Sequence, residues 1–212
     1  MHSCIVIGID CATEPKKRGI AFGRYASNNT CEVTSAETGL TDQEISSRVH
    51  QLLNGQTKVL LALDAPLGWP LALGNTLARH TAGQPLTSTA DMMFRRETDR
   101  FVKRTCGKQP LDVGADRIAR TAHSALTLLS AISDMNEYEI PLAWNPDFKR
   151  IAAIEVYPAA TLRAYSLPDS SYKDKNEKND KDVRKKIVDG LPPSLKLPSD
   201  REPLLADRKS VV

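Results

Sequence analysis

Residues 4–13 read CIVIGIDCAT, an apolar run that ends on a single acid, Asp10. The run is short and rich in β-branched residues, which is typical of a strand in the centre of a sheet. Asp10 therefore stands at the carboxyl end of a predicted strand. An acid in that position either accepts hydrogen bonds from the following turn or serves as the first ligand of a metal or phosphate site.

Two further strands are expected at short intervals along the chain. The segments KRGIAFGR (17–24) and CEVTSAETG (31–39) have the composition of strands, and the turn-forming residues SNNT lie between them. Connections this short favour antiparallel pairing, because a parallel pair needs a long crossover. The first part of the chain is therefore expected to form a three-stranded antiparallel meander.

A helix and a fourth strand come next. Thr41 and Glu44 have the spacing of a capping box, and apolar residues at helical spacing follow them. The segment VLLALD (59–64) is almost entirely apolar, so it should be a strand that is covered on both faces. A helical crossover would make this strand parallel to the first. Asp10 and Asp64 would then lie at the carboxyl ends of neighbouring strands.

The next part of the chain is expected to be mainly helical before it returns to the sheet. Residues 65–149 form a predicted helical insertion, with helices over 89–104 and 115–134. The segment RIAAIEVYP (150–158) has strand composition again and carries a third acid, Glu155. The predicted fold is therefore α/β, with a mixed sheet in which parallel strands follow the antiparallel meander.

The composition is that of an ordinary globular chain. A length of 212 residues suits one domain over 1–212, and apolar and charged residues make up 41% and 26% of it. The net charge of +3 permits an anionic partner without demanding one. No apolar run approaches the roughly 18 residues of a membrane span, and no signal sequence is evident, so we expect a cytoplasmic protein without a membrane partner. The spacing of the cysteines favours free thiols in a reducing cytosol over a metal or disulfide framework: these are Cys4, Cys11, Cys31 and Cys106.

Three predicted strands end on or beside an acid, namely Asp10, Asp64 and Glu155. Carboxylates that gather at one edge of a sheet repel one another unless divalent cations neutralise them, and oxygen ligands suit Mg²⁺ or Mn²⁺. Two such ions about 4 Å apart can activate a water molecule and stabilise the leaving oxygen of a phosphodiester. The three acids are accordingly the predicted metal ligands and catalytic residues.

Four motifs in this order resemble those of a known family: GIDCAT…RGIAFG, LALDAPLGWP, FRRETDRFVKR and IEVYPAATLRAY. The order of the predicted strands is similar to that of the ribonuclease H-like fold. The motifs more closely resemble the uncharacterised-domain family 429 of predicted RNase H-like nucleases, and the resemblance covers nearly the whole chain. It implies a nuclease whose metal site is carried by Asp10 and Asp64, with Glu155 as a third acid.

The C-terminal part of the chain departs from that family pattern. Residues 170–212 read as a charged loop, a short helix and an incomplete helical region, ending in REPLLADRKSVV. Members of the family usually end in a helix with an Asp-x-x-Asp-Ala-like segment, whereas Asp207 is the only acid nearby here. We expect the last metal ligand to be absent or to come from elsewhere. An apolar surface left uncovered by such a helix would favour association with another copy of the chain.

The segment 89–104 carries most of the predicted contacts to nucleic acid. Arginine offers bidentate geometry to phosphate, so this basic stretch could hold a phosphate backbone. The alternative is a solvated helix face in which Glu97 and Asp99 act as local partners of the basic side chains. The predicted phosphate-binding residues are Arg95, Arg96, Arg100 and Lys103.

Three functions remain open at this stage. The first is a metal-dependent nuclease, which binds nucleic acid as substrate. The second is an actin-like ATP- or phosphate-binding protein, although those proteins need a second domain that 212 residues do not supply. The third is a nucleic-acid- or protein-binding scaffold whose acids are catalytically incomplete. Trp69 could stack on a base, but a plug at the rim of the sheet is the simpler interpretation.

Overall fold

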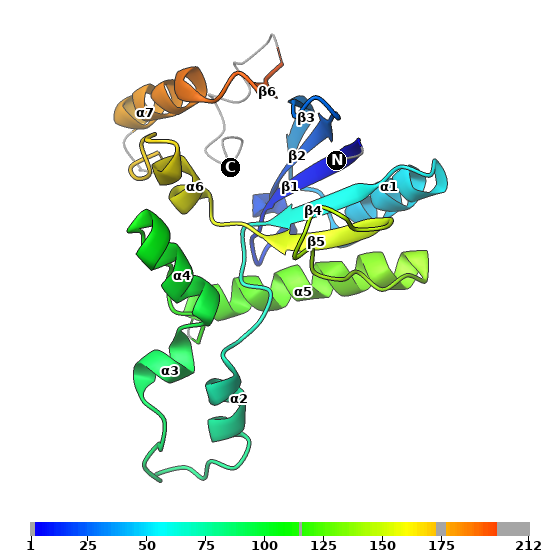
Figure 1. Cartoon of the computed structure of the whole chain (residues 1–212). Coiled ribbons are helices and arrows are strands. Elements are labelled where there is room, and N and C mark those ends of the chain that lie inside the picture. The colour runs from blue at the N-terminus through cyan, green and yellow to red at the C-terminus, as the bar shows by residue number, and fades with distance from the viewer. Residues whose placement is uncertain (1–2, 115, 173–176, 199–212) are drawn as a thin grey trace.

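The predicted first strand, β1 (Cys4–Asp10), lies inside a six-stranded sheet in the computed structural model, which describes residues 3–114, 116–172 and 177–198 (Figure 1). The strand order is β5-β4-β1-β2-β3-β6. β1 and β3 pair antiparallel with β2, β4 pairs parallel with β1, and β5 pairs parallel with β4. The predicted mixed sheet is thus confirmed. The remaining strands are β2 (Gly19–Tyr25), β3 (Cys31–Thr38), β4 (Val59–Leu63), β5 (Ile151–Glu155) and β6 (Leu195–Lys196), which pairs parallel with β3.

The meander is produced by two short connections. A single turn of 3-10 helix, η1 (Pro15–Lys17), leads from β1 into β2. Between β2 and β3 the chain reverses at a tight turn in which the Ala26 amide donates to the Thr30 carbonyl at 2.8 Å. Asn29 occupies a positive φ of 61° there, a conformation that asparagine tolerates better than most residues.

The capping box predicted from Thr41 and Glu44 is present at the start of α1 (Asp42–Asn54). The Glu44 amide donates to the Thr41 hydroxyl at 3.2 Å, and the Thr41 amide donates to the Glu44 carboxylate at 2.7 Å. Both bonds satisfy backbone donors that the first helical turn leaves without partners. The helix then carries the chain across the sheet, so that β4 returns parallel to β1.

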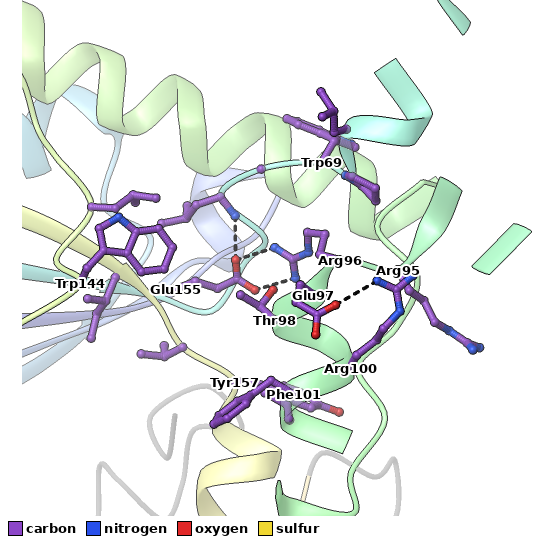
Figure 2. A pocket seen from close by; sticks show the side chains of 18 of the residues that line it. Trp69, Arg95, Arg96, Glu97, Thr98, Arg100, Phe101, Trp144, Glu155 and Tyr157 are labelled. Carbon is purple, nitrogen blue, oxygen red and sulfur yellow. Dashed lines mark hydrogen bonds and ion pairs between the residues drawn. The ribbon is translucent and has the colours of Figure 1, made fainter. Parts of the chain in front are cut away.

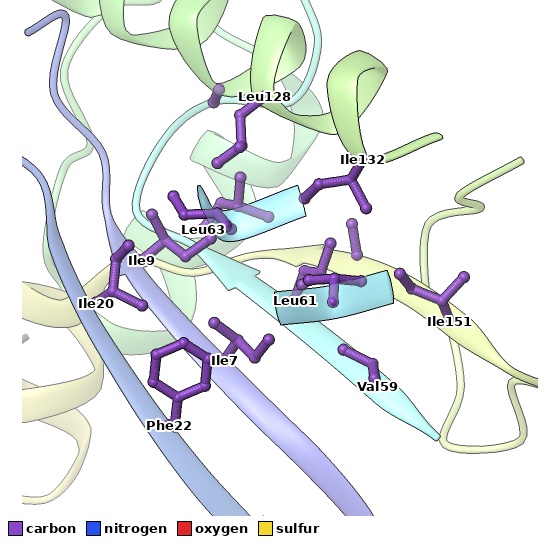
Figure 3. Close-up of a cluster of buried hydrophobic side chains, with 14 of the residues drawn as sticks. Ile7, Ile9, Ile20, Phe22, Val59, Leu61, Leu63, Leu128, Ile132 and Ile151 are labelled. Carbon is purple, nitrogen blue, oxygen red and sulfur yellow. The ribbon is translucent and has the colours of Figure 1, made fainter. Parts of the chain in front are cut away.

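The main core lies between one face of the sheet and two helices (Figure 3). Alternate strand residues such as Ile7, Ile9, Leu61 and Leu63 point to this face and are almost completely buried. They pack against α1 and α5 (Asp116–Asn136), and these two helices also pack against each other. The predicted helix over 115–134 is therefore part of the central core, although it lies in the expected helical segment between β4 and β5.

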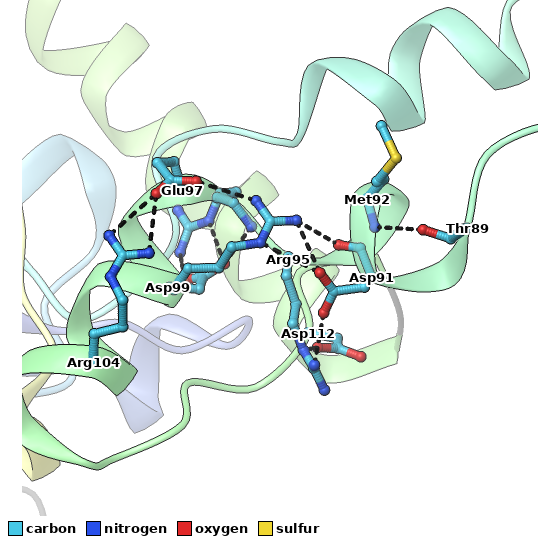
Figure 4. Close-up of polar contacts among 10 residues, drawn as sticks. Thr89, Asp91, Met92, Arg95, Glu97, Asp99, Arg104 and Asp112 are labelled. Atoms are coloured by element: carbon cyan, nitrogen blue, oxygen red, sulfur yellow. Dashed lines mark hydrogen bonds and ion pairs between the residues drawn. The ribbon is translucent and has the colours of Figure 1, made fainter.

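One predicted helix is divided in two by the structure. The stretch 89–104 forms α3 (Ala90–Phe94) and α4 (Glu97–Cys106), with extended backbone at Arg95 between them. The second helix begins afresh because the Asp99 carboxylate accepts a hydrogen bond from the Arg96 amide at 2.8 Å, which caps its first turn (Figure 4). Together with α2 (Leu71–Leu77), α3 projects away from the sheet (Figure 1).

The C-terminal helices lie on the opposite side of the sheet from α5 (Figure 1). They are α6 (Pro158–Ala164) and α7 (Glu177–Gly190), and a small second core contains Leu162, Tyr172 and Ile187. Asp207 falls outside the described residues, and the expected association of two copies through an uncovered apolar surface stays a prediction. Within the described ranges, no helix has the length and apolarity that crossing a membrane requires.

Candidate functional site

Asp10 and Asp64 lie side by side at the carboxyl ends of the neighbouring parallel strands β1 and β4. Asp10 is the last residue of β1, and Asp64 directly follows β4. The Asp64 amide donates to the Ile9 carbonyl at 2.9 Å, which continues the pairing of the two strands to their ends. Ile9 and Leu63 are register partners that point into the core, so alternation directs the next residues, Asp10 and Asp64, to the opposite face.

The electrostatics around the two acids are consistent with this placement. Burial, followed by the charges of Asp64 and Asp10, raises the pKa of the Cys11 thiol to about 12. Burial and the same two carboxylates also raise the pKa of the Tyr172 phenol to about 12. Both side chains are protonated at pH 7, as they would be at their ordinary pKa values. Tyr172, which is far from both acids in the sequence, therefore lies near Asp10 and Asp64, and Cys11 directly follows Asp10.

The raised pKa of Cys11 predicts that its thiol reacts slowly with alkylating reagents. At pH 8 we expect iodoacetamide to modify Cys11 at least ~100-fold more slowly in the native protein than in urea, because the thiolate is the nucleophile. The native rate should rise about tenfold per pH unit between pH 8 and pH 10, because the pKa of about 12 lies above this range. Peptide mass spectrometry at timed intervals measures both rates. Equal rates in native and urea-unfolded protein would contradict the placement of Cys11.

Glu155, the third predicted ligand, is engaged elsewhere. In the sheet it is the register partner of Leu63, so it leaves the strand on the face opposite to Asp64. The Arg96 guanidinium donates to both of its carboxylate oxygens, at 2.6 and 2.7 Å, and the Leu67 amide donates at 3.0 Å (Figure 2). The structure brings Asp10 and Asp64 together and pairs Glu155 with Arg96. Among the described residues, no three or more His, Cys, Asp or Glu side chains are grouped to hold a metal.

The predicted phosphate-binding residues are largely occupied by neighbouring acids. Arg96 is only 12% exposed and bridges Glu155 to the buried carboxylate of Asp99. Arg95 and Arg100 share Asp91, with nitrogen-to-oxygen distances of 2.8 and 3.1 Å (Figure 4). These contacts agree with the alternative in which local acids partner the basic residues. The other contacts of this network join Arg95 to Asp112, Arg100 to Glu97 and Arg104 to Glu97, while Lys103 is exposed.

Loss of the Glu155 carboxylate is expected to destabilise the protein measurably. Glu155→Ala should lower the free energy of unfolding by about 2 kcal/mol, because it removes charged hydrogen bonds from a nearly buried guanidinium. Glu97→Ala is the matched control: its carboxylate also pairs with arginines of α4 but is 73% exposed, so its loss should cost less than about 1 kcal/mol. Urea titration measures both, and equal small losses would contradict the role of Glu155.

Sequence reasoning missed a cavity of about 1030 Å³ beside these residues. It is lined by the end of β5, the segment 67–72, helix α4 and the segment 142–144. Trp69, Trp144 and Phe101 line it and are 41%, 81% and 58% exposed. Trp69 is partly exposed, which leaves open both a plug at the rim of the sheet and a stacking surface. Each tryptophan lies in a proline-containing segment between predicted helices and strands. Such segments are usually loops at the surface, so they give a weak indication that the ring is exposed.

The chain was compared with known proteins. A family model described as a protein of unknown function (DUF429) matches residues 8–211. The matched range contains Asp10, Asp64 and Glu155, and it also contains the arginines and aromatic residues of the cavity. No curated protein and no solved structure matches the chain.

Proposed function

We propose that the chain, which belongs to the DUF429 family, is a metal-dependent nuclease that hydrolyses phosphodiester bonds in nucleic acid. The observation that carries the proposal is the adjacency of Asp10 and Asp64 at the carboxyl ends of parallel strands β1 and β4. Catalytic and ligand-binding groups of open α/β sheets gather at this edge. The strand order also agrees with the ribonuclease H-like fold that the sequence resemblance implies.

The two carboxylates fit the chemistry of Mg²⁺ or Mn²⁺. Mg²⁺ is commonly held by one or two carboxylates together with water and the phosphate groups of a substrate. Asp10 and Asp64 offer oxygen ligands from two adjacent strands, whose pairing places the two residues at neighbouring positions. Burial is the main cause of the raised pKa values of Cys11 and Tyr172, and the charges of Asp64 and Asp10 add to it, so both side chains lie near the two acids. We therefore assign the metal to these two acids and assign Glu155 to the support of Arg96.

Such an ion, when bound, supplies a nucleophilic water and stabilises the charge that develops on a phosphodiester. The residues of the chain would hold the ion and position it for this chemistry. Asp10 and Asp64 would bind the ion at the end of the rigid sheet. Tyr172 keeps its proton at neutral pH, since its pKa is about 12, and so adds no negative charge beside the site. No side-chain nucleophile is required.

The test is an assay of the purified protein with Mg²⁺ or Mn²⁺ on single-stranded and duplex DNA, on RNA and on RNA–DNA hybrids. We expect cleavage of at least one of these substrates and complete loss of cleavage in EDTA. Absence of cleavage with either metal on every substrate would contradict the proposal, and so would cleavage that EDTA leaves unchanged.

The cellular compartment is part of the same proposal. All four cysteines are free, including Cys4, which is buried, and Cys11, which lies beside the two acids. Free thiols are the normal state in a reducing compartment, where disulfides are rare. This supports our prediction of a cytoplasmic nuclease.

A further inference from the structure

The turn that follows β4, residues 64–67, is held at both of its ends. The Asp64 amide donates to the Ile9 carbonyl at 2.9 Å, and the Leu67 amide donates to the Glu155 carboxylate at 3.0 Å. The two acceptors belong to β1 and β5, which flank β4 on either side. The turn is therefore fastened to both neighbouring strands, on one side by the backbone and on the other by a side chain.

The Glu155 carboxylate is itself held in place by α4. Its Oε2 atom accepts hydrogen bonds from the Leu67 amide at 3.0 Å and from the Arg96 guanidinium at 2.6 Å, and its Oε1 atom accepts a second one from Arg96 at 2.7 Å (Figure 2). Arg96 is only 12% exposed and also pairs with the buried carboxylate of Asp99. Bidentate pairs of this kind fix the plane of the carboxylate as well as its position. One oxygen of Glu155 thus joins α4 to the turn 64–67.

Apolar packing also holds the turn 64–67. Ala65 is 5% exposed and belongs to the main core, and Leu67 packs against the same core. Loss of the Glu155 carboxylate should therefore leave the turn folded but remove a polar fixed point on the carboxyl side of Asp64. The direction of a side chain depends on the backbone on both sides of it, so a looser turn lets the Asp64 carboxylate move.

We propose that Glu155 is a positioning residue, which acts through the Leu67 amide to hold the Asp64 carboxylate beside that of Asp10. Groups that lie behind the direct ligands of a metal orient those ligands, and their loss typically costs roughly 10–100-fold in metal affinity or activity. The third acid of the sequence pattern thus serves the site from the opposite face of the sheet. As a statement about a metal ion, the inference rests on the proposed nuclease function; as a statement about the backbone of Asp64, it can be tested alone.

The first test measures amide hydrogen exchange in the metal-free protein by NMR. Glu155→Ala should raise the exchange rate of the Leu67 amide at least ~10-fold, because this amide loses its acceptor. The Asp64 amide should exchange at least ~3-fold faster as well, since the turn that follows it is released on one side. Unchanged exchange at Asp64 would overturn the inference, because Glu155 would then hold only Leu67.

The second test measures the affinity for Mn²⁺ by isothermal titration calorimetry. Glu155→Ala should weaken Mn²⁺ binding at least ~10-fold. Glu155→Gln should stay within about threefold of the wild type, because its amide oxygen, in the place of Oε2, can still accept hydrogen bonds from Leu67 and Arg96. Wild-type affinity in Glu155→Ala, or equal losses for Glu155→Ala and Glu155→Gln, would contradict a role that acts through the Leu67 amide.

Two control variants separate positioning from a general loss of stability. Glu97→Ala removes a carboxylate that is 73% exposed and pairs with Arg100 and Arg104, and Ile132→Val removes one methylene group from the buried core. Both should leave Mn²⁺ affinity within about twofold of the wild type. Circular dichroism checks that each variant is folded.

The two tests also separate this inference from the proposed function. If the wild-type protein binds no Mn²⁺, the metal assignment fails, and the exchange of the Asp64 amide alone decides whether Glu155 positions this residue. If the protein binds Mn²⁺ and cleaves nucleic acid while Glu155→Ala keeps full Mn²⁺ affinity, the nuclease proposal stands and the positioning role fails.

Discussion

Asp64→Asn is expected to lower metal-dependent cleavage at least ~1000-fold while leaving the fold intact. The substitution keeps the size of the side chain and the backbone bond from residue 64 to the Ile9 carbonyl. It removes one of the two charges that we assign to the metal. A bound ion contributes several kcal/mol of transition-state stabilisation, and about 4 kcal/mol corresponds to a factor of about 1000 in rate. Asp10→Asn should have an effect of the same order.

Two further substitutions make this result specific. Asp134→Asn removes an exposed carboxylate of α5, so it should leave the rate within about twofold. Glu155→Gln should lower the rate far less than Asp64→Asn, because Glu155 pairs with Arg96 and points away from the two acids. Initial rates at saturating Mn²⁺ measure all four variants. An Asp64→Asn protein with more than a tenth of the wild-type rate would contradict the metal assignment.

Asp42→Ala is expected to destabilise the protein by about 3 kcal/mol. Its partner Arg18 is only 2% exposed, so this long cationic side chain is almost completely buried. The Arg18 guanidinium donates to the Asp42 carboxylate at 2.6 Å and to the Leu40 carbonyl at 3.3 Å. Removing Asp42 leaves a buried cation without its counter-ion, a change that typically costs 3–5 kcal/mol. The side chain of Asp42 is 34% exposed, which places the expected loss at the lower end.

Two controls accompany this prediction: a variant of an exposed ion pair and a double variant that removes both Arg18 and Asp42. Glu37 and Arg48 form a bidentate pair with side chains more than one third exposed, so Glu37→Ala should cost less than about 1 kcal/mol. Arg18→Met combined with Asp42→Ala should recover much of the loss, because no unpaired charge remains buried. Urea unfolding gives all three values. A loss below 1 kcal/mol for Asp42→Ala would show that Arg18 finds another partner.

The sheet and the two central acids could be predicted because their causes are local. The capping box at Thr41 marks the start of α1, and the apolar run 59–64 identifies β4 as a buried strand. Helix α1 joins β3 to β4, so that β4 returns parallel to β1 and Asp10 and Asp64 come together. Each of these steps depends on residues close together in the sequence and on a general rule of connection.

The role of Glu155 could not be read from the same pattern. Its strand was predicted, but the face on which its side chain leaves depends on register with β4, and one residue of register reverses that face. The break at Arg95 depends on the capping of α4 by Asp99, which lies inside an apparently continuous helix. The cavity joins segments as distant as 67–72 and 142–157, so it appears only when β5 and α4 are placed beside each other.

The most direct test of the metal site is a crystal of the protein soaked in Mn²⁺ and measured for anomalous scattering. We predict one strong peak or two at the carboxyl ends of β1 and β4, within about 2.1 Å of carboxylate oxygens from both Asp10 and Asp64. The same soak of the Asp64→Asn protein should lose that density. A peak that contacts neither acid, or no peak at saturating Mn²⁺, would contradict the assignment.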